Sequence, residues 1–466
     1  MPTNPRRIMA VLLLPLFMAL VSVSVVNVGL HAIEQSVHAT SQNLQWVLAG
    51  YALTFGLLLV PAGRVGDATG RKRMLMVGVA IFTLGGTLSG VAQSPITLNI
   101  YRVIQGIGAG LMNPQTSALI QYHFRDRARA KAFAAMGTTV AIATAIGPVI
   151  GGLLIGMLGD NLGWRCMFLI NLPLGIIALI LAMRWLPDDK VAASQRPYLD
   201  LIGAVILVLT VIAIMLPFFY RRPWYVWLLL IAGAVLTRVF IAWERHVKDT
   251  GKPPMVNMNI FRDEAFRNGV IIITVYFVGA TSTWIVIPMF LQAGTGRSAL
   301  TASMVSLPAS LMAAVSSQWA GRHVFEYGRT MVAAGFGITL LGLIGATFVA
   351  APIYHGSAGI WPLMLVALLM GVGQGMTVSP NQTLTLRAVD PRFGGVAGGL
   401  ISLGQRVGTA VGAAMIPGVL FGVVETGGSW LHAFVAATSV ICVTTAAAGL
   451  LSLYDRRREV RDAALA

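Results

Sequence analysis

The sequence predicts an all-α polytopic membrane protein made of two six-helix bundles with two linker transmembrane helices between them. The first observation is composition, because mean hydropathy is +0.77 and 11% of the 466 residues are charged. Soluble globular chains carry about 25% charged residues. The second is a series of apolar segments of about 20 residues, each long enough to cross a bilayer as a helix. The third is a loop pattern that occurs twice.

The apolar segments justify the helices in order, as six, two and six spans. The predicted spans are 9–31, 44–62, 74–92, 97–121, 133–157, 166–186, 200–219, 225–243, 268–291, 299–319, 331–350, 359–383, 396–421 and 430–453. Four regions follow from this fourteen-helix arrangement. They are an N-terminal bundle at 1–187, a linker with two extra spans and a cytoplasmic loop at 188–267, a C-terminal bundle at 268–454, and a cytoplasmic tail at 455–466.

Charge predicts the orientation of the chain. The net charge is +16, but the lysines and arginines fall in short loops on alternate sides of the spans. This is the positive-inside pattern, so we expect both termini in the cytoplasm and no nucleic-acid partner. We interpret the run that follows Met1–Arg7 as an uncleaved first helix. Cys166 and Cys442 lie in apolar segments, which predicts neither a disulfide framework nor a metal site.

A glycine- and arginine-rich loop marks each half of the chain. In the first half it contains Gly63, Asp67, Gly70, Arg71 and Arg73. In the second half the frame returns as Gly321, Gly328 and Arg329, and both glycines are offset by 258 residues. Glycine adopts positive φ without a Cβ clash, so we expect a tight turn at the membrane surface in each half. The offset predicts a duplicated module.

Alternate glycines occur within one span of each half. Gly106, Gly108 and Gly110 precede an Asn-Pro-Gln-Thr segment, and Gly371, Gly373 and Gly375 precede Ser-Pro-Asn-Gln-Thr. A nucleotide-binding interpretation fails, because no strand precedes these glycines and no acid follows at the required distance. Close helix packing in lipid is the better interpretation. Gly404, Gly408 and Gly412, at intervals of four residues, carry the same prediction.

Several motifs together resemble one family. The loop from Gly63 to Lys72 resembles the cytoplasmic loop motif of the major facilitator superfamily. Arg102, Gln105 and Gly106 resemble its helix-four motif, and Gly147, Pro148, Gly151 and Gly152 resemble its antiporter motif. Segments 163–175, 290–299 and 405–408 are similar to the fourteen-helix drug:proton antiporter branch. The resemblance covers almost the whole chain and implies the major facilitator fold.

That resemblance implies alternating access, in which two bundles rock about a central site. Asp67 is then expected to cap a neighbouring helix N-terminus or to pair with an arginine, unless it serves the turn alone. Arg102 is expected to face inward, near a cavity or polar partner, or to be satisfied by helix carbonyls. Pro148 is expected to bend its helix and seal the interface between bundles, or only to pack.

The chain departs from this branch in its first helix. Val26-Asn27-Val28 is present, but Ser22 stands where the branch carries an aspartate, and none of the seventeen acids falls in the middle of a predicted span. We therefore expect a neutral, zwitterionic or anionic substrate rather than a dication. Proton coupling would use Glu34, Asp67 or a histidine such as His31, although an interfacial role is the ordinary one for such a histidine.

Polar residues in four spans are the candidates for the substrate cavity, and each could instead connect helices by hydrogen bonds. They are Ser22, Asn27, Asn113, Gln115, Tyr276, Thr283, Trp284, Gln374, Asn381 and Arg406. Together they predict a polar, mostly uncharged cavity. Aromatic and methionine walls would tolerate varied ligands.

The sequence as a whole predicts a multidrug efflux transporter of the plasma membrane that exports small amphiphilic compounds by proton antiport. The alternative is a dedicated exporter of a metabolite, an antibiotic or a lipid-like molecule with another coupling or none. No catalytic constellation is present, so we expect no enzyme and no cofactor. The expected partners are a small-molecule substrate and the lipid bilayer, and the expected state is a monomer.

Overall fold

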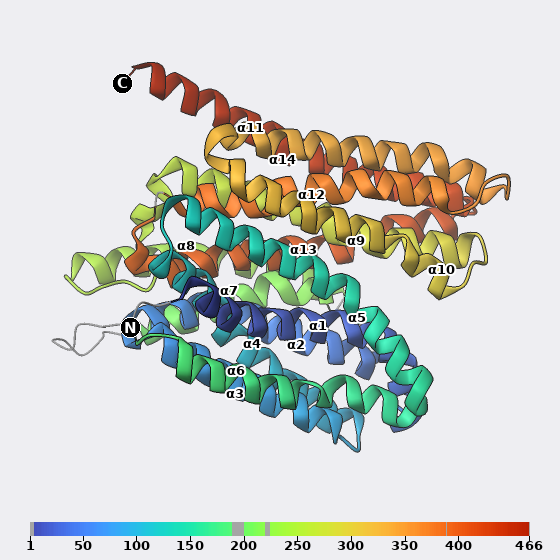
Figure 1. Ribbon diagram of the computed structural model, residues 1–466, viewed down its shortest axis with the longest axis horizontal. Helices are drawn as coiled ribbons and strands as arrows, with labels where there is room; N and C mark the ends of the chain where they lie inside the picture. The colour runs from blue at the N-terminus through green and yellow to red at the C-terminus, as the bar shows by residue number, and fades with distance from the viewer. Residues whose placement is uncertain (1–3, 189–199, 220–223, 388, 466) are drawn as a thin grey trace. The chain divides into compact units, whose positions relative to one another are not determined.

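The computed structural model describes residues 4–188, 200–219, 224–387 and 389–465, and it is helical along nearly all of them (Figure 1). In the first half the helices are α1 (Pro5–Val37), α2 (Ser41–Thr69), α3 (Arg71–Gly90), α4 (Pro95–His123), α5 (Asp126–Leu169) and α6 (Asn171–Trp185). The linker forms α7 (Leu201–Phe219), η1 (Trp224–Leu228), α8 (Leu229–Asp249) and η2 (Met258–Arg262). The second half forms α9 (Glu264–Met289), η3 (Phe290–Gly294), α10 (Ala299–Met304), α11 (Ser306–Tyr354), α12 (Trp361–Arg387), η4 (Pro391–Phe393), α13 (Gly394–Glu425) and α14 (Trp430–Leu465).

The helices form two compact units, and each unit takes one segment from the opposite half of the chain. The first unit holds residues 1–124 and 143–262 together with 389–403, the beginning of α13. The second holds 263–388 and 404–466 together with 125–142, the beginning of α5. Two helices, α5 and α13, therefore belong to one unit at their N-terminal ends and to the other beyond.

Eleven segments of the described chain are long and apolar enough to cross a membrane. Two of them, 126–185 and 306–354, each join two predicted spans, and α4 is not among the eleven. The long helices are interrupted by non-helical backbone at Gly159 in α5 and at Gly328 in α11. The structure thus gives a polytopic helical protein, while the number of fourteen spans stays a prediction.

The duplication predicted from the loop repeat is visible in the helix packing. In the first unit α4 packs against both α2 and α3, and in the second α12 packs against α11. A Cβ on Gly106 would meet α2 at Tyr51, and one on Gly108 would lie 2.2 Å from the Phe82 nitrogen of α3. In the second half, glycines of α12 approach α11 in the same way, one before and one after the Gly328 break.

The counterparts in the second half are Gly371 and Gly373. A Cβ on Gly371 would lie 2.0 Å from the Ala309 oxygen, before the break, and one on Gly373 would lie 2.5 Å from the Gly335 oxygen, after it. The alternating glycines are therefore helix seams, as the sequence predicted, because any side chain there would collide with backbone. The same holds for Gly412, whose Cβ would overlap the Val278 oxygen of α9.

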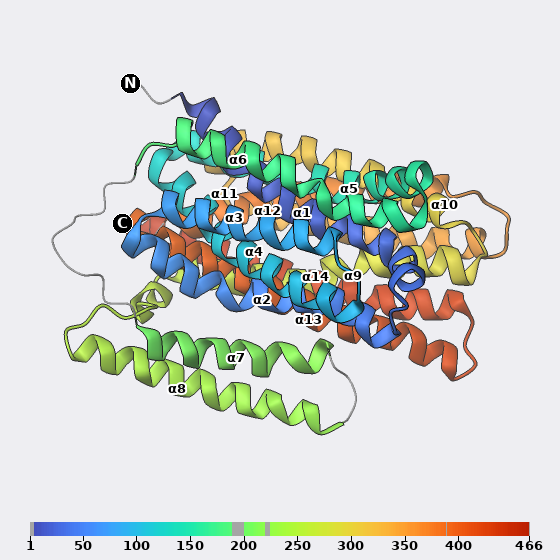
Figure 2. The ribbon, with the colours of Figure 1, turned by 90° about the horizontal axis from the view of Figure 1, so that it is seen from below.

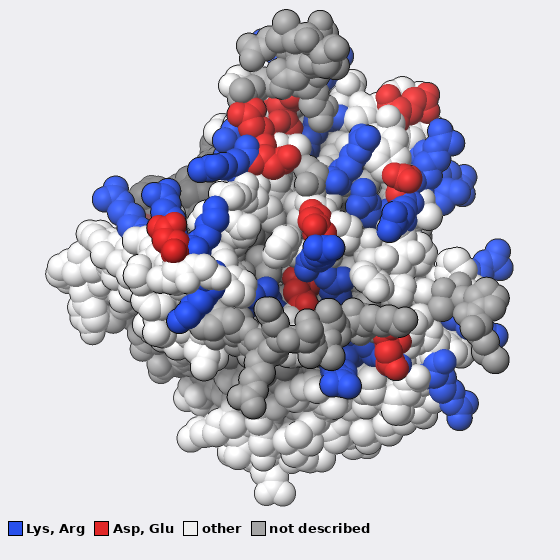
Figure 3. Space-filling model, turned by 90° about the vertical axis from the view of Figure 1, so that its left-hand side faces the viewer, with Lys and Arg blue, Asp and Glu red and all other residues white. Residues whose placement is uncertain are grey.

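The linker helices α7 and α8 lie side by side in the first unit, and α7 packs on α2 (Figure 2). The predicted cytoplasmic loop from Glu244 onward begins later than expected, because α8 continues to Asp249 and Glu244 is 1% exposed. At the other end of the chain, α14 continues through the predicted tail to Leu465. Asp455 lies on it and is buried. Figure 3 shows one face of the molecule, on which lysine, arginine, aspartate and glutamate side chains gather.

Candidate functional site: the loop-motif clasp

The loop motif of the first half forms a tight turn between α2 and α3. The turn residue is Gly70, whose φ of 116° lies in the region that glycine alone adopts readily. Because α3 starts immediately after it, Arg71 is held against the protein and is 5% exposed. Beside the turn, Lys72 lies 2.9 Å from the exposed carboxylate of Asp188 and lowers the pKa of that group by hydrogen bonding and charge.

Asp67 makes both of the contacts expected of it. One carboxylate oxygen accepts a hydrogen bond of 2.8 Å from Arg71 Nε. The same carboxylate accepts from the backbone N–H groups of Gly395, at 3.1 Å, and Val396, at 3.1 Å. Those two groups belong to the first turn of α13, where unpaired N–H groups carry partial positive charge. Asp67 is therefore both an ion-pair partner and an anionic cap.

Arg71 completes the contact from the other side. Its Nη2 donates to the carbonyl oxygens of Pro391, at 2.7 Å, and Arg392, at 3.1 Å, just before α13. Gly63, one turn before Asp67, approaches the same segment so closely that a Cβ there would lie 2.4 Å from the Gly395 oxygen. We call Asp67, Arg71 and residues 391–396 the loop-motif clasp. It fastens the end of α2 to the beginning of α13.

The second loop motif uses a different acid. Gly328 turns the chain with φ 49°, and Arg329 follows it, 1% exposed. Phe325 occupies the position equivalent to Asp67, so the counter-charge comes from Asp455 of α14, whose Oδ2 lies 2.7 Å from Arg329 Nε. Arg329 also donates to Asn381 of α12 and to the Ala265 oxygen at the start of α9. This pair ties four helices of one unit together rather than clasping a helix N-terminus.

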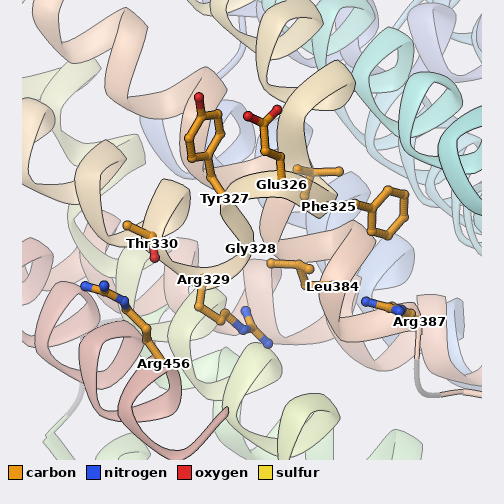
Figure 4. Close-up of a pocket in the computed structure, with 10 residues that line it drawn as sticks. Phe325, Glu326, Tyr327, Gly328, Arg329, Thr330, Leu384, Arg387 and Arg456 are labelled. Carbon is orange, nitrogen blue, oxygen red and sulfur yellow. The ribbon is translucent and has the colours of Figure 1, made fainter. Parts of the chain in front are cut away.

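A pocket of about 330 Å³ opens at this second turn (Figure 4). Arg456 and Arg387 lie on opposite sides of the Gly328 backbone, and Glu326 and Tyr327 point away from Arg329. Arg387 stacks over the ring of Phe325, 5.4 Å from its centroid. None of the residues predicted for the substrate cavity lines this pocket, so it is a surface feature of the second loop.

Arg102 is buried in the first unit within a chain of polar contacts. Its Nε donates to the Val47 oxygen at 3.0 Å, and its Nη1 donates to Gln105 Oε1 at 2.6 Å. Gln105 donates to Ser22 at 3.5 Å, and Ser22 donates to Asn171 of α6 at 3.1 Å. The guanidinium also lies 4.3 Å from the ring centroid of Tyr51, which stabilises the charge by a cation–π contact.

Both of the sequence interpretations of Arg102 therefore have support. The carbonyl of Val47 satisfies it structurally, and Gln105 is its polar partner. Ser22, at the position where the related branch carries an acid, contributes a hydroxyl to the same chain. Among the residues that the structure describes, no carboxylate lies beside Arg102 in the first unit.

The antiporter motif lies on α5 against α1. A Cβ on Gly147 would overlap the Ser24 hydroxyl, and one on Gly151 would lie 3.2 Å from the Val25 oxygen. Ser24 donates across the same contact to the Ala143 oxygen. In contrast, Gly152 has no atom within 4 Å of such a Cβ. Two of the motif glycines are explained by close approach to α1, and the sealing role of Pro148 stays a prediction.

The residues predicted for the cavity differ from one another in burial. Ser22, Gln115 and Asn381 are buried and hydrogen-bonded to neighbouring helices, with Gln115 donating to the Ala62 oxygen. Tyr276 and Thr283 are buried as well. The partly exposed ones are Asn113, Trp284, Gln374 and Arg406. The side chain of Asn27 lies outside the described residues.

The coupling candidates also differ in position. Asp67 belongs to the clasp, Glu34 is exposed, and the side chain of His31 lies outside the described part. The sequence predicted Asp200 at the first position of a span, Glu244 just after a span and Asp455 in the tail, yet they are 2%, 1% and 4% exposed. Each of these acids flanks a long apolar run. This position was the only sequence feature that could have indicated their burial, because an acid at the edge of a span is buried when a neighbouring helix covers it.

Comparison with known proteins identifies the family. A sequence model of the Major Facilitator Superfamily matches residues 12–243 and 260–465. This chain belongs to the major facilitator superfamily. It is therefore a multi-pass membrane transporter and not an enzyme. The fold agrees with that of the human organic anion transporter MFSD10, at a TM-score of 0.70 and 13% identity, covering 96% of this chain and 99% of that one.

The structure of the proton:xylose symporter XylE gives the same TM-score of 0.70 at 14% identity, over 97% of this chain and 95% of that one. Among relatives by sequence, the probable actinorhodin transporter of Streptomyces coelicolor is 30% identical over 87% of this chain and 70% of its own length. The multidrug resistance protein Stp of Mycobacterium tuberculosis is 30% identical over 87% and 74%, respectively.

The lincomycin resistance protein LmrB of Listeria innocua is 27% identical over 88% of this chain and 86% of its own length. Relatives of this kind place the chain in the multidrug-efflux branch of the superfamily, as the motifs predicted.

Proposed function

We propose that this transporter exports small amphiphilic compounds or drugs across the plasma membrane by alternating access, in exchange for protons. The observation that carries the proposal is the loop-motif clasp. A carboxylate on one helix holds the N-terminus of a helix from the other half of the chain, and we expect this contact to break when the two halves of the chain separate at this end. Such a contact is a gate whose strength sets the resting state.

The topology proposed with it has fourteen spans, both termini in the cytoplasm, and a monomer as the working unit. Support comes from the placement of lysine and arginine along the sequence. The segment 126–185, which contains α5 and α6, and the segment 306–354, which is interrupted at Gly328, supply two spans apiece. With α4 included, the eleven apolar segments then expand to the predicted number.

The substrate is proposed to be neutral, zwitterionic or anionic. Ser22 stands in place of an acid, and the buried charge of that region is the cation Arg102. A buried guanidinium repels a dication and attracts an anion. The names of the relatives support amphiphilic antibiotics as the compound class.

A dedicated exporter of one antibiotic or metabolite is the second candidate. It is favoured by the relative described as a probable actinorhodin transporter and by the absence of an acid at position 22. Resistance profiling of a deletion strain, compared with accumulation of its own metabolites, separates the two. Broad sensitisation supports drug export, while intracellular build-up of one compound supports dedicated export.

Everted membrane vesicles test substrate charge directly. Under an imposed proton gradient, uptake of a matched series of neutral, anionic, monocationic and dicationic dyes is measured with wild type and with the Asp67→Asn variant. We expect uptake of the neutral and anionic members by wild type. Strong preference for dications would overturn the charge assignment, and no gradient-dependent uptake of any member would overturn the proposed function.

A further inference from the structure

Two buried carboxylates lie at the end of the linker helix pair where α7 begins and α8 ends. Asp200 immediately precedes α7 and Glu244 lies near the end of α8, and the two helices run side by side (Figure 2). Asp200 is 2% exposed and Glu244 1% exposed. Neither belongs to the loop-motif clasp or to the polar chain around Arg102.

The hydrogen bonds of the two acids are unequal. Asp200 is well satisfied, because Oδ1 accepts from the Gly203 nitrogen at 2.9 Å and the Trp243 indole N–H reaches Oδ1 at 3.0 Å and Oδ2 at 3.1 Å. Glu244 accepts from the Val256 nitrogen through Oε2, at 3.2 Å. Its Oε1 is buried and has no hydrogen-bond partner among the described residues.

The unpartnered oxygen faces the other carboxylate. A Cβ on Gly203 would lie 2.4 Å from Asp200 Oδ2 and 3.0 Å from Glu244 Oε1. Both oxygens therefore surround the same point, which is free only because residue 203 has no side chain. Two carboxylates that border one buried point repel each other when both are ionised.

Within the described part of the chain, one cation acts on this pair. Asp200 and Arg64 of α2 are the described charged groups that act on Glu244, and Arg64 also interacts with Asp67, three residues further along that helix. Asp67 has Arg71 as its own partner, so Arg64 is the described cation left for the two linker carboxylates and does not neutralise both. The simplest way to satisfy the open acceptor and remove the excess negative charge is a proton on Glu244.

We propose that Glu244 binds one exchangeable proton beside Asp200 and that the two form a protonation site in the linker helices, outside the bundles' own spans. Binding adds a proton to the Glu244 carboxylate, whose O–H then donates toward Asp200, and release returns it to water. The site also gives proton exchange a buried carboxylate that the first helix lacks at Ser22. Only this use in coupling rests on the proposed function.

Arg64 relates the site to the clasp. It lies on the same helix as Asp67, and a change of charge at the carboxylate pair alters the field on its guanidinium. When the pair is protonated, Arg64 is left to interact more strongly with Asp67. Proton binding in the linker thereby changes the electrostatic environment of Asp67, which caps α13.

Infrared difference spectroscopy tests the site on the full chain in liposomes. Spectra are recorded while pH is stepped across neutrality, for wild type, Asp200→Asn, Glu244→Gln and the exposed control Asp188→Asn. We expect a protonated-carboxyl absorption in wild type and in D188N that titrates with pH, and its loss in D200N and E244Q. Folding of each variant is checked by size-exclusion chromatography.

The wild-type spectrum tests the protonation site even if a variant fails to fold. Absence of any titrating carboxyl band in wild type overturns it, and so does a band of unchanged size in folded E244Q. A second measurement, the pH dependence of substrate transport, should be flattened in D200N and E244Q and kept in D188N. If wild type moves no substrate, the proposed function fails while the band still decides the protonation site.

Discussion

The Asp67→Asn substitution tests the clasp most sharply. Both partners are buried, with side-chain exposures of 2% for Asp67 and 6% for Arg71. Removing one charge of a buried pair costs about 3–5 kcal/mol, because the other charge remains without compensation. Asparagine keeps the shape and one acceptor oxygen, so we take the lower figure, about 3 kcal/mol. The cost falls on the closed clasp alone, since water solvates both groups once it opens.

At about 1.4 kcal/mol for each factor of ten, this loss shifts the open-to-closed ratio at this end about 100-fold toward open. A reporter is available in Ala397, which is 0% exposed and follows the capped residue Val396 in α13. In a background free of Cys166 and Cys442, the labelling rate of Ala397→Cys by a membrane-impermeant maleimide measures opening. We expect D67N to raise this rate by up to that factor.

Two controls accompany the measurement. Asp188→Asn removes an exposed acid that pairs with Lys72 and should leave the rate unchanged. The double variant Asp67→Asn with Arg71→Gln removes the orphan charge as well, so it should label more slowly than D67N alone. An unchanged rate in D67N would refute the reasoning, because the clasp would then contribute nothing to closure.

Three further predictions concern stability, each measured by thermal unfolding in detergent. Gly108→Val should prevent stable folding, because its Cβ would lie 2.2 Å from the Phe82 nitrogen. Gly152→Val should leave the melting temperature unchanged, because no atom lies within 4 Å of a Cβ there. Equal effects of the two variants would contradict close packing of α4 on α3 at Gly108. Asp455→Asn should destabilise the second unit by about 3 kcal/mol because the buried Arg329 loses its counter-charge, and wild-type stability would disprove this. Arg102→Lys should lower the melting temperature because an ammonium loses the fork geometry and most of the ring contact, and a neutral result would show that only charge matters there.

Much of the fold could be predicted because it depends on local features of the sequence. The span pattern follows from apolar length, and the two turns follow from Gly70 and Gly328, which both have positive φ. The duplicated seams follow from glycine spacing. Each of these features can be predicted from residues that are neighbours in the sequence or from the internal repeat.

The buried acids could not be located in the same way. Asp200, Glu244 and Asp455 stand at the edges of apolar runs, where the sequence does not say whether another helix covers them. Their burial depends on contacts with segments far away in the chain, such as Arg329, 126 residues before Asp455. For the same reason the sequence left open whether Ser22 and Asn381, polar residues in apolar spans, line a cavity or connect helices, and in this structure both form hydrogen bonds to other helices.

Substrate-dependent proton movement in proteoliposomes shows whether export is coupled to protons. Purified protein is reconstituted with a pH-sensitive dye inside, and neutral, anionic and dicationic compounds are added in turn without any other ion gradient. We expect a neutral or anionic amphiphile to drive proton movement opposite to its own, and D67N to alter the rate. Substrate transport without any accompanying proton flux would contradict it.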